Sequence, residues 1–168
     1  MSSVQTETNT LIPAGTWAVD PVHSSIRWDV IDLAAGMKSV SGRFTDFEGS
    51  LEGGGEPILA GVVRTASLLT DHEQRDAHLR SQDMLDTDRF PEIRFASTGV
   101  EHVDGDRYKL RGDLVIKETP LEVELDAKLQ GAGTDATGVE KTLFRVSGNI
   151  EWGPTRVEIT ADITAISQ

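Results

Sequence analysis

The sequence predicts an all-β domain of about eight antiparallel strands with one helical insertion at about residues 70–82. Apolar and polar residues alternate along most of the chain from Trp17 onward, as in strands that have one dry face and one wet face. Most links between the alternating segments are short and contain turn residues, which favours antiparallel hairpins over crossover helices. The alternation stops between Thr70 and Phe90-Pro91, where charged residues crowd together.

Eight segments carry the alternation of a strand. It is clearest in residues 121–129 (LEVELDAKL) and 157–166 (VEITADITAI). Weaker alternation marks residues 25–31, 40–51, 58–67, 93–103, 107–117 and 142–151. The turns between them include residues 53–55, 104–106, 131–138 and 153–154. Periodicity does not separate a sandwich from a closed barrel, so both architectures stay open at this point.

Two segments are candidates for helices. Residues 33–38 are a short candidate. In the longer insertion, Thr70 is followed three residues later by Glu73, which has the form of a capping box and predicts a helix that ends near Gln82. Residues 1–15 are polar and predict a flexible tail, which leaves residues 16–168 as a single domain.

Composition argues against several classes of function. The 168 residues include 16 Lys and Arg and 28 Asp and Glu, and the net charge of −12 disfavours nucleic acid and anionic bilayers as partners. The absence of cysteine excludes disulfides, Cys-ligated zinc and thiol nucleophiles. The N-terminus lacks the basic start and apolar core of a signal peptide, and no apolar run approaches the ~20 residues that span a bilayer. We therefore expect a cytoplasmic protein without stable membrane insertion.

The insertion carries the polar residues with the strongest claim to a site. Arg75 and His78 lie three residues apart and would share one face of a helix, with Arg80 well round from Arg75. They predict either a cationic mouth for a phosphate or other polar head, or a structural anchor that ties the helix to the sheet. A metal site drawn from His72, Asp76 and His78 is disfavoured, because the two histidines would point in nearly opposite directions.

A hydrolase triad can be drawn from Asp20, His23 and Ser24. Neighbouring residues of a strand point to opposite faces, so Ser24 does not easily face His23, and no Gly-x-Ser-x-Gly elbow occurs. A hydrogen-bonded histidine at the start of a strand is the simpler interpretation. We expect no catalytic residue, no metal and no cofactor.

An apolar set lies on the predicted dry faces and either fills a core or lines a ligand tube. Its members are Ile26, Trp28, Val30, Phe44 or Phe47, Val62, Phe95, Leu110, Leu114, Ile116, Val123, Leu125, Val146, Ile150 and Ile159. Filling a barrel stabilises it by roughly 25 cal/mol per Å² of buried apolar surface. An empty tube costs about 24 cal/mol of folding stability per Å³ of cavity volume, so a tube is tolerable mainly when an apolar ligand occupies it.

Four motifs in order resemble the YceI-like family. They are WAVDPVHSSIRWDV (17–30), VSGRFTDFEGSL (40–51), RDAHLRSQDMLDTDRFPEIRFAST (75–98) and LRGDLVIK (110–117). The resemblance covers most of the chain from Trp17 to about Lys128. It implies a lipocalin-like, antiparallel eight-stranded barrel with an elongated apolar cavity that binds polyisoprenoid lipids, isoprenyl phosphates or quinones. It also makes a homodimer an expectation.

The resemblance and the apolar set together predict binding, sequestration or transport of an isoprenoid-type lipid in the barrel. The predicted ligand-binding residues are Ile26, Trp28, Val30, Phe44, Phe47, Val62, Arg75, His78, Met84, Leu85, Phe95, Leu114 and Ile116. Two alternatives stay open: an enzyme that acts on a lipid head group, and a protein-interaction module built on a filled barrel.

The sequence departs from the family pattern at three places. Paired aromatics are usual where this chain has Met84-Leu85, and a glycine is usual near Glu118. An Arg-x-Asp-Phe-Gly-like element is reduced here to residues 151–153 (EWG). If these positions shape the pocket, the preferred ligand differs from that of other members.

Overall fold

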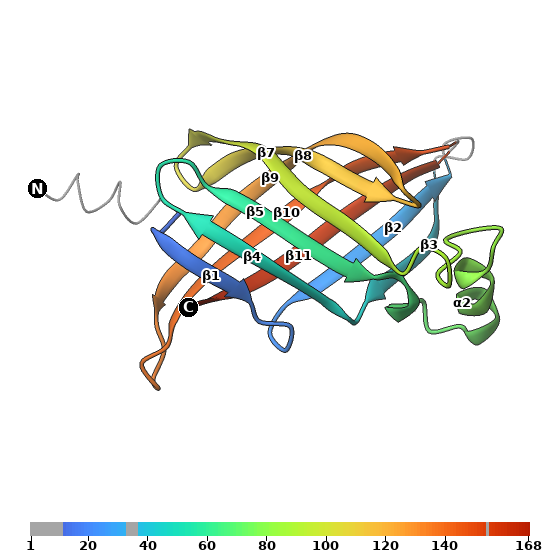
Figure 1. Ribbon diagram of the computed structural model, residues 1–168, viewed down its shortest axis with the longest axis horizontal. Coiled ribbons are helices and arrows are strands. Elements are labelled where there is room, and N and C mark those ends of the chain that lie inside the picture. The colour runs from blue at the N-terminus through green and yellow to red at the C-terminus, as the bar shows by residue number, and fades with distance from the viewer. Residues whose placement is uncertain (1–11, 33–36, 154) are drawn as a thin grey trace, which may run out of the picture.

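The computed structural model describes residues 12–32, 37–153 and 155–168 (Figure 1). The first half of the chain forms β1 (Gly15–Val19), β2 (Ser25–Asp32), β3 (Met37–Phe44), β4 (Phe47–Gly53) and β5 (Ile58–Arg64). A 3-10 turn (Thr65–Ser67), the short strand β6 (Leu68–Leu69) and helix α2 (Glu73–Arg80) follow. The second half forms β7 (Glu92–Asp104), β8 (Arg107–Ile116), β9 (Thr119–Thr134), β10 (Glu140–Trp152) and β11 (Thr155–Ser167).

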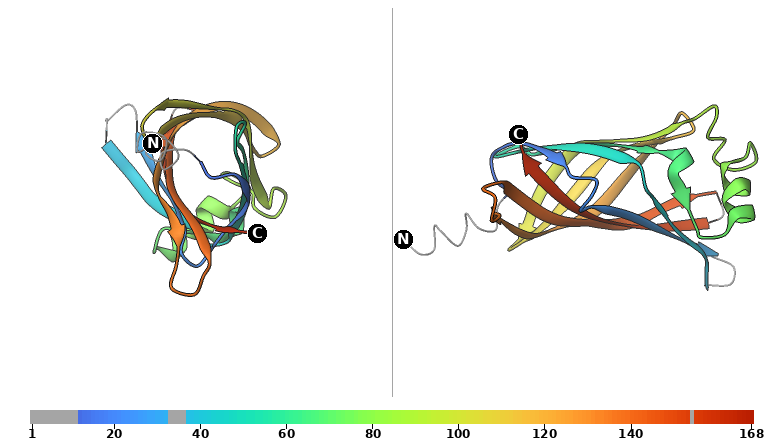
Figure 2. Two further views of the ribbon diagram at one scale, coloured as in Figure 1. Left: turned by 90° about the vertical axis from the view of Figure 1, so that its left-hand side faces the viewer. Right: turned by 90° about the horizontal axis from the view of Figure 1, so that it is seen from below.

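These strands form one antiparallel sheet that closes into a barrel of eight strand positions. The order around the barrel is β1-β4-β5-β7-β8-β9-β10-β11, and β11 returns to pair with β1. β11 also pairs with β2, and β3 continues into β4, so β1 with β2 and β3 with β4 are two bent strands. Figure 2 shows the ring end-on. The predicted antiparallel barrel is confirmed, and the sandwich is excluded.

The three residues of the candidate triad lie in the bend between β1 and β2. The Asp20 carboxylate accepts a hydrogen bond from the backbone N–H of Val22 (3.0 Å) and lies 2.6 Å from Nδ1 of His23. The hydrogen bond with His23 is the main cause that lowers the pKa of Asp20. The Ser24 hydroxyl instead accepts from the backbone N–H of Thr164 (3.0 Å). Asp20 and His23 therefore stabilise a bend, and the Ser24 hydroxyl is engaged with β11.

The helical insertion is shorter than predicted. Helix α2 spans residues 73–80 instead of 70–82, and its N-cap is His72, whose Nδ1 accepts from the backbone N–H of Arg75 (3.3 Å). Thr70 does not cap the helix, because its N–H and hydroxyl both donate to Oδ1 of Asp76 (2.9 and 2.5 Å). In the short candidate helix, residues 33–36 lie outside the described residues, and residues 37–38 begin β3.

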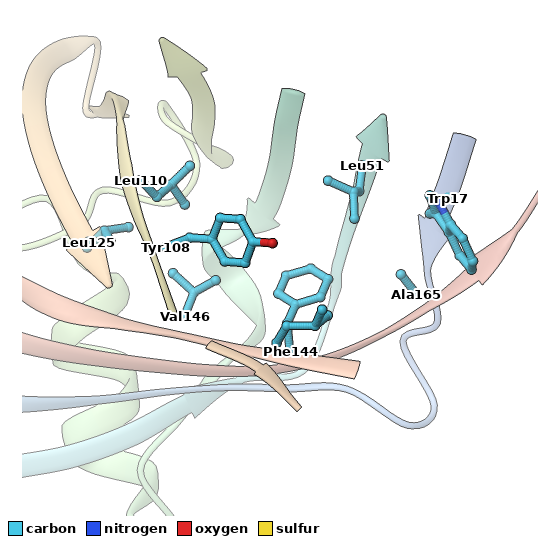
Figure 3. Close-up of a cluster of buried hydrophobic side chains, with 9 residues drawn as sticks. Trp17, Leu51, Tyr108, Leu110, Leu125, Phe144, Val146 and Ala165 are labelled. Atoms are coloured by element: carbon cyan, nitrogen blue, oxygen red, sulfur yellow. The ribbon is translucent and has the colours of Figure 1, made fainter. Parts of the chain in front are cut away.

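Large side chains fill the barrel at the end opposite α2. Figure 3 shows this packed cluster, which consists of Trp17, Leu51, Tyr108, Leu110, Leu125, Leu129, Phe144, Val146 and Ala165. The chain before β1 joins it, since the backbone N–H of Ile12 donates to the Tyr108 hydroxyl (3.1 Å). The barrel is therefore closed by a solid core at this end. Within the described residues, no helix is both long and apolar enough to cross a bilayer.

Candidate functional site

An apolar cavity of about 660 Å³ lies between the packed cluster and the α2 end of the barrel. The packed cluster closes the inner end of this cavity, because four residues belong to both: Leu110, Leu125, Phe144 and Val146. The size of the cavity falls within the roughly 300–1,000 Å³ of small-molecule sites. The interior is therefore hollow over part of its length and solid over the rest.

Most of the predicted ligand-binding residues line this cavity. Eleven of the thirteen do so: Ile26, Trp28, Val30, Phe44, Phe47, Val62, Met84, Leu85, Phe95, Leu114 and Ile116. Arg75 and His78 are not part of the lining.

Val62 contributes its backbone to the cavity wall. It pairs with the charged residues Glu48 on β4 and Arg94 on β7, which are both exposed. Directly paired residues point to the same face of a sheet, so the Val62 side chain lies on the outer face. Val63 takes the inward position, opposite the buried Phe47. The inward orientation that the sequence suggested for Val62 therefore belongs to its neighbour.

Glycines on the inner face give the cavity its room. Gly42 pairs with Trp28, and a Cβ atom at Gly42 would lie 2.4 Å from Cζ2 of that indole, so the ring lies flat on the strand. Gly49 and Gly61 pair across β4 and β5, which leaves this part of the wall without side chains. A Cβ atom at Gly61 would meet only the Glu48 carbonyl oxygen, at 3.5 Å. Space therefore lies in front of Gly61.

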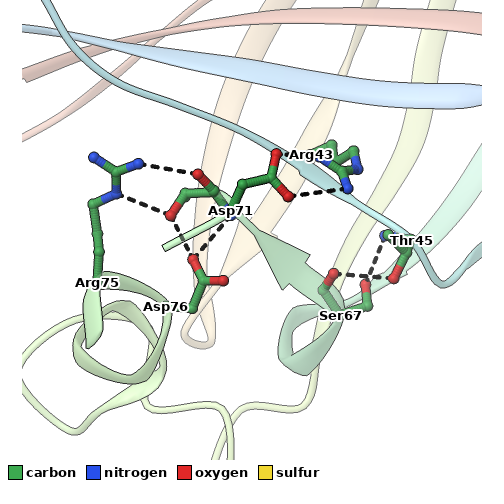
Figure 4. Close-up of polar contacts among 7 residues, drawn as sticks. Arg43, Thr45, Ser67, Asp71, Arg75 and Asp76 are labelled. Carbon is green, nitrogen blue, oxygen red and sulfur yellow. Dashed lines mark hydrogen bonds and ion pairs between the residues drawn. The ribbon is translucent and has the colours of Figure 1, made fainter. Parts of the chain in front are cut away.

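The charged residues of the insertion anchor α2 to the segment 66–70 that precedes it, and Figure 4 shows the contacts of Arg75 and Asp76. Arg75 donates through Nε and a terminal nitrogen to the hydroxyl and carbonyl oxygens of Thr70 (2.9 and 3.0 Å). Arg80 donates to the carbonyl oxygens of Ala66 (3.0 Å) and Leu68 (2.6 Å). The hydrogen bond from the Thr70 hydroxyl is the main cause that lowers the pKa of the buried Asp76. This arrangement matches the anchor interpretation of Arg75, and His78 is exposed to solvent.

A different basic residue reaches the cavity. Among the described residues of its lining, Lys117 is the single cation. Its Nζ donates to the carbonyl oxygen of Met84 (2.9 Å) and lies 5.9 Å from the centre of the Phe90 ring. Lys117 and Glu118 form the turn between β8 and β9, and both have left-handed backbones with φ of 52° and 62°. Non-glycine residues adopt this conformation at a cost of about 1–2 kcal/mol each, so this turn is strained.

The three departures from the family pattern meet at the mouth of the cavity. Met84, Leu85, Trp152 and Gly153 all line it, and Glu118 adjoins Lys117 in the turn. These segments come from the loop after α2, the β8–β9 turn and the β10–β11 turn. Residues that are far apart in the sequence thus form one rim, which we call the mouth.

No metal site emerges from the predicted candidates. Within residues 12–32, 37–153 and 155–168, no group of three or more His, Asp or Glu side chains is arranged to hold an ion. His72 caps α2, and Asp76 accepts from Thr70.

Comparison with known proteins identifies the family of this barrel. Residues 17–165 match the YceI-like domain. The chain belongs to the YceI-like family. It is 37% identical over 120 residues to a UPF0312 protein of Photorhabdus laumondii, a match that covers 69% of this chain and 62% of the relative. It is 36% identical over 133 residues to Protein YceI of Escherichia coli O157:H7, covering 77% of this chain and 68% of that protein.

A solved structure shares the fold at low sequence identity. It is a polyisoprenoid binding domain from Saccharophagus degradans implicated in plant cell wall breakdown. The two structures superpose with a TM-score of 0.71 at 12% identity, over 90% of this chain and 98% of the other. This YceI-like chain thus shares its barrel fold with a distant domain.

Proposed function

We propose that this protein binds a single isoprenoid-type lipid, such as a polyisoprenoid, an isoprenyl phosphate or a quinone, within the barrel. The observation that carries the proposal is the apolar cavity of about 660 Å³, which opens at the mouth and ends on the packed cluster. The similarity to a polyisoprenoid binding domain supports the choice of ligand class. The function is sequestration or transport, in which the lipid leaves the barrel unchanged.

The lining suits a flexible hydrocarbon tail. Aliphatic side chains such as Ile26, Val30 and Ile159 make up much of the wall, with Trp28 and Phe95 among the few aromatic rings. Each methylene group that moves from water into this lining contributes about 0.8 kcal/mol of affinity. The tail therefore supplies most of the binding free energy, and the polar head determines orientation.

We place the head at the mouth beside Lys117. Lys117 lines the cavity and its ammonium group donates to the carbonyl oxygen of Met84, another lining residue, whereas Arg75 is hydrogen-bonded to Thr70 and lies outside the lining. A carbonyl or phosphate oxygen there would accept a hydrogen bond from Lys117. Asp83 also lines the mouth, so the local charge is mixed.

Native mass spectrometry of protein purified without detergent tests the proposal. We expect one lipid per chain after isolation or after incubation with a polyprenol, a polyprenyl phosphate or a quinone. Solvent extraction should return the added lipid chemically unchanged. Protein that stays empty with all three lipids, while its fold is intact by circular dichroism, would overturn the proposed function.

A further inference from the structure

Two exposed apolar side chains continue the cavity lining onto the outer surface. Six large apolar residues are exposed among those described: Val22, Ile58, Met84, Val103, Leu143 and Trp152. Of these six, Met84 and Trp152 also line the cavity. They are 40% and 38% exposed and come from the loop after α2 and the end of β10. Apolar surface therefore runs from the interior to both of these segments of the mouth.

The packed end lacks this continuity in the part of the chain that the structure describes. Ile58 at the start of β5 and Val103 near the end of β7 are exposed there, but neither lines the cavity. The packed cluster separates that end from the hollow part of the barrel. Figure 1 shows the β4–β5 and β7–β8 turns at the end opposite α2. A long apolar ligand therefore has its route at the mouth.

Charges of both signs surround the exposed pair. Lys117 and Asp83 both line the cavity, and Glu118 is exposed next to Lys117. A zwitterionic lipid head group carries an ammonium and a phosphate, which match this mixed rim. A strongly anionic surface is instead repelled by the net charge of −12.

We propose that the mouth docks on a zwitterionic bilayer surface through Met84, Lys117 and Trp152, and that lipid enters and leaves the barrel there. Tryptophan favours the membrane–water interface, and interfacial binding grows with the apolar area that is buried. Each methylene group of a lipid tail lowers the equilibrium partition of the lipid into water about fourfold. Transfer from the barrel to a bilayer in contact with it avoids this exposure to water and is therefore much faster than release into solution. This inference rests on the proposed lipid-binding function.

Transfer kinetics test the docking step. Protein loaded with a polyprenol from detergent solution is mixed with empty phosphatidylcholine vesicles, and the polyprenol that stays bound to the protein is measured by mass spectrometry at timed intervals. Transfer through contact requires a rate that rises in proportion to vesicle concentration. The rate of transfer through water is set by release from the protein and does not depend on vesicle concentration. We expect the proportional rise for the natural sequence. A rate that is independent of vesicle concentration would overturn the docking proposal.

Matched variants locate the docking surface. Met84→Ser combined with Trp152→Ser should lower the slope of rate against vesicle concentration about tenfold and reduce flotation with empty vesicles. Ile58→Ser combined with Val103→Ser removes similar exposed residues from the packed end and should change neither measurement. Equal slopes and equal flotation for the two double variants would overturn the assignment of the mouth.

The same measurements separate failure of docking from failure of lipid binding. Lipid uptake from detergent solution together with absent flotation on empty vesicles would refute docking and leave the proposed function intact. Flotation through the mouth by a protein that takes up no lipid from vesicles or detergent would support docking and refute the proposed function. Adding phosphatidylglycerol to the vesicles should lower the slope. A rise would overturn the preference for a zwitterionic surface.

Discussion

Filling the cavity from Gly61 should separate folding from ligand binding. Gly61 faces the hollow part of the barrel, opposite Gly49, and a Cβ atom there has ordinary van der Waals contact with one backbone oxygen. Gly61→Leu therefore adds a side chain to space that the ligand would occupy. The matched control is Gly61→Ala, which makes the same backbone change with little added volume.

The stability of the ligand-free protein should rise. Replacing a strand glycine at a compatible position gains about 0.4–1 kcal/mol from the unfolded state. Burying a leucine side chain contributes about 1.5–3 kcal/mol when burial is complete, and it is partial in an open cavity. We expect a net gain of about 2 kcal/mol, which raises the Tm of a domain of this size by about 4–8 °C. Thermal unfolding followed by circular dichroism measures this gain.

Ligand affinity should fall in the same variant. A leucine side chain displaces about four methylene groups of lipid, worth about 3 kcal/mol or roughly a hundredfold in Kd. Gly61→Ala should stay within a few-fold of the natural sequence. Isothermal titration with a detergent-dispersed polyprenol gives both values. Unchanged affinity in Gly61→Leu would refute the position of the cavity, and a loss of stability would refute the space in front of Gly61.

Four further predictions concern the wall, the anchor and the mouth. Gly42→Val should cost about 3 kcal/mol in urea unfolding, because the new side chain collides with the Trp28 ring; unchanged stability would show that this ring moves freely. Asp76→Ala should cost about 2 kcal/mol, since the buried N–H and hydroxyl of Thr70 lose their acceptor, and Asp76→Asn should cost less; equal losses would contradict this role. The fold lowers the pKa of Asp76 from 3.8, so the ionised carboxylate stabilises the folded state above about pH 4, and this stabilisation is lost as the pH falls through the lower folded pKa. The fall in urea midpoint on acidification should therefore be smaller in Asp76→Ala than in the natural sequence. Glu118→Gly should gain about 1 kcal/mol in thermal unfolding by relieving a left-handed backbone, and a loss would show that the Glu118 side chain stabilises the turn.

Strand periodicity predicted the barrel wall well where one face is clearly apolar. The alternation in residues 121–129 lies within β9, and that of 157–166 lies within β11. On β2, the predicted inward residues Ile26, Trp28 and Val30 all line the cavity. The prediction failed for the direction of Val62 because residues 58–63 (ILAGVV) are apolar on both faces, so alternation gives no direction there.

Contacts made by barrel closure could not be predicted from local patterns. Lys117 appears in the sequence as the polar end of a strand. Only the closed barrel brings its ammonium group close enough to donate a hydrogen bond to the carbonyl oxygen of Met84. Ile12 appears as part of a tail, yet its backbone N–H donates to Tyr108, 96 residues away. The capping box failed because Asp76 competes for the Thr70 hydroxyl. The cytoplasmic location and the homodimer stay predictions.

The packed core and the proposed ligand-binding cavity occupy different lengths of this barrel. The large rings of Trp17, Tyr108 and Phe144 pack at one end, so a closed core supports the fold without any ligand. The hollow end is held by strand pairing and by the polar anchor of α2, which need no filled interior. The three departures from the family pattern all lie at the mouth and none lies in the packed cluster. Under the proposed function, substitution at the mouth can therefore change which lipid is preferred while the core that specifies the barrel stays intact.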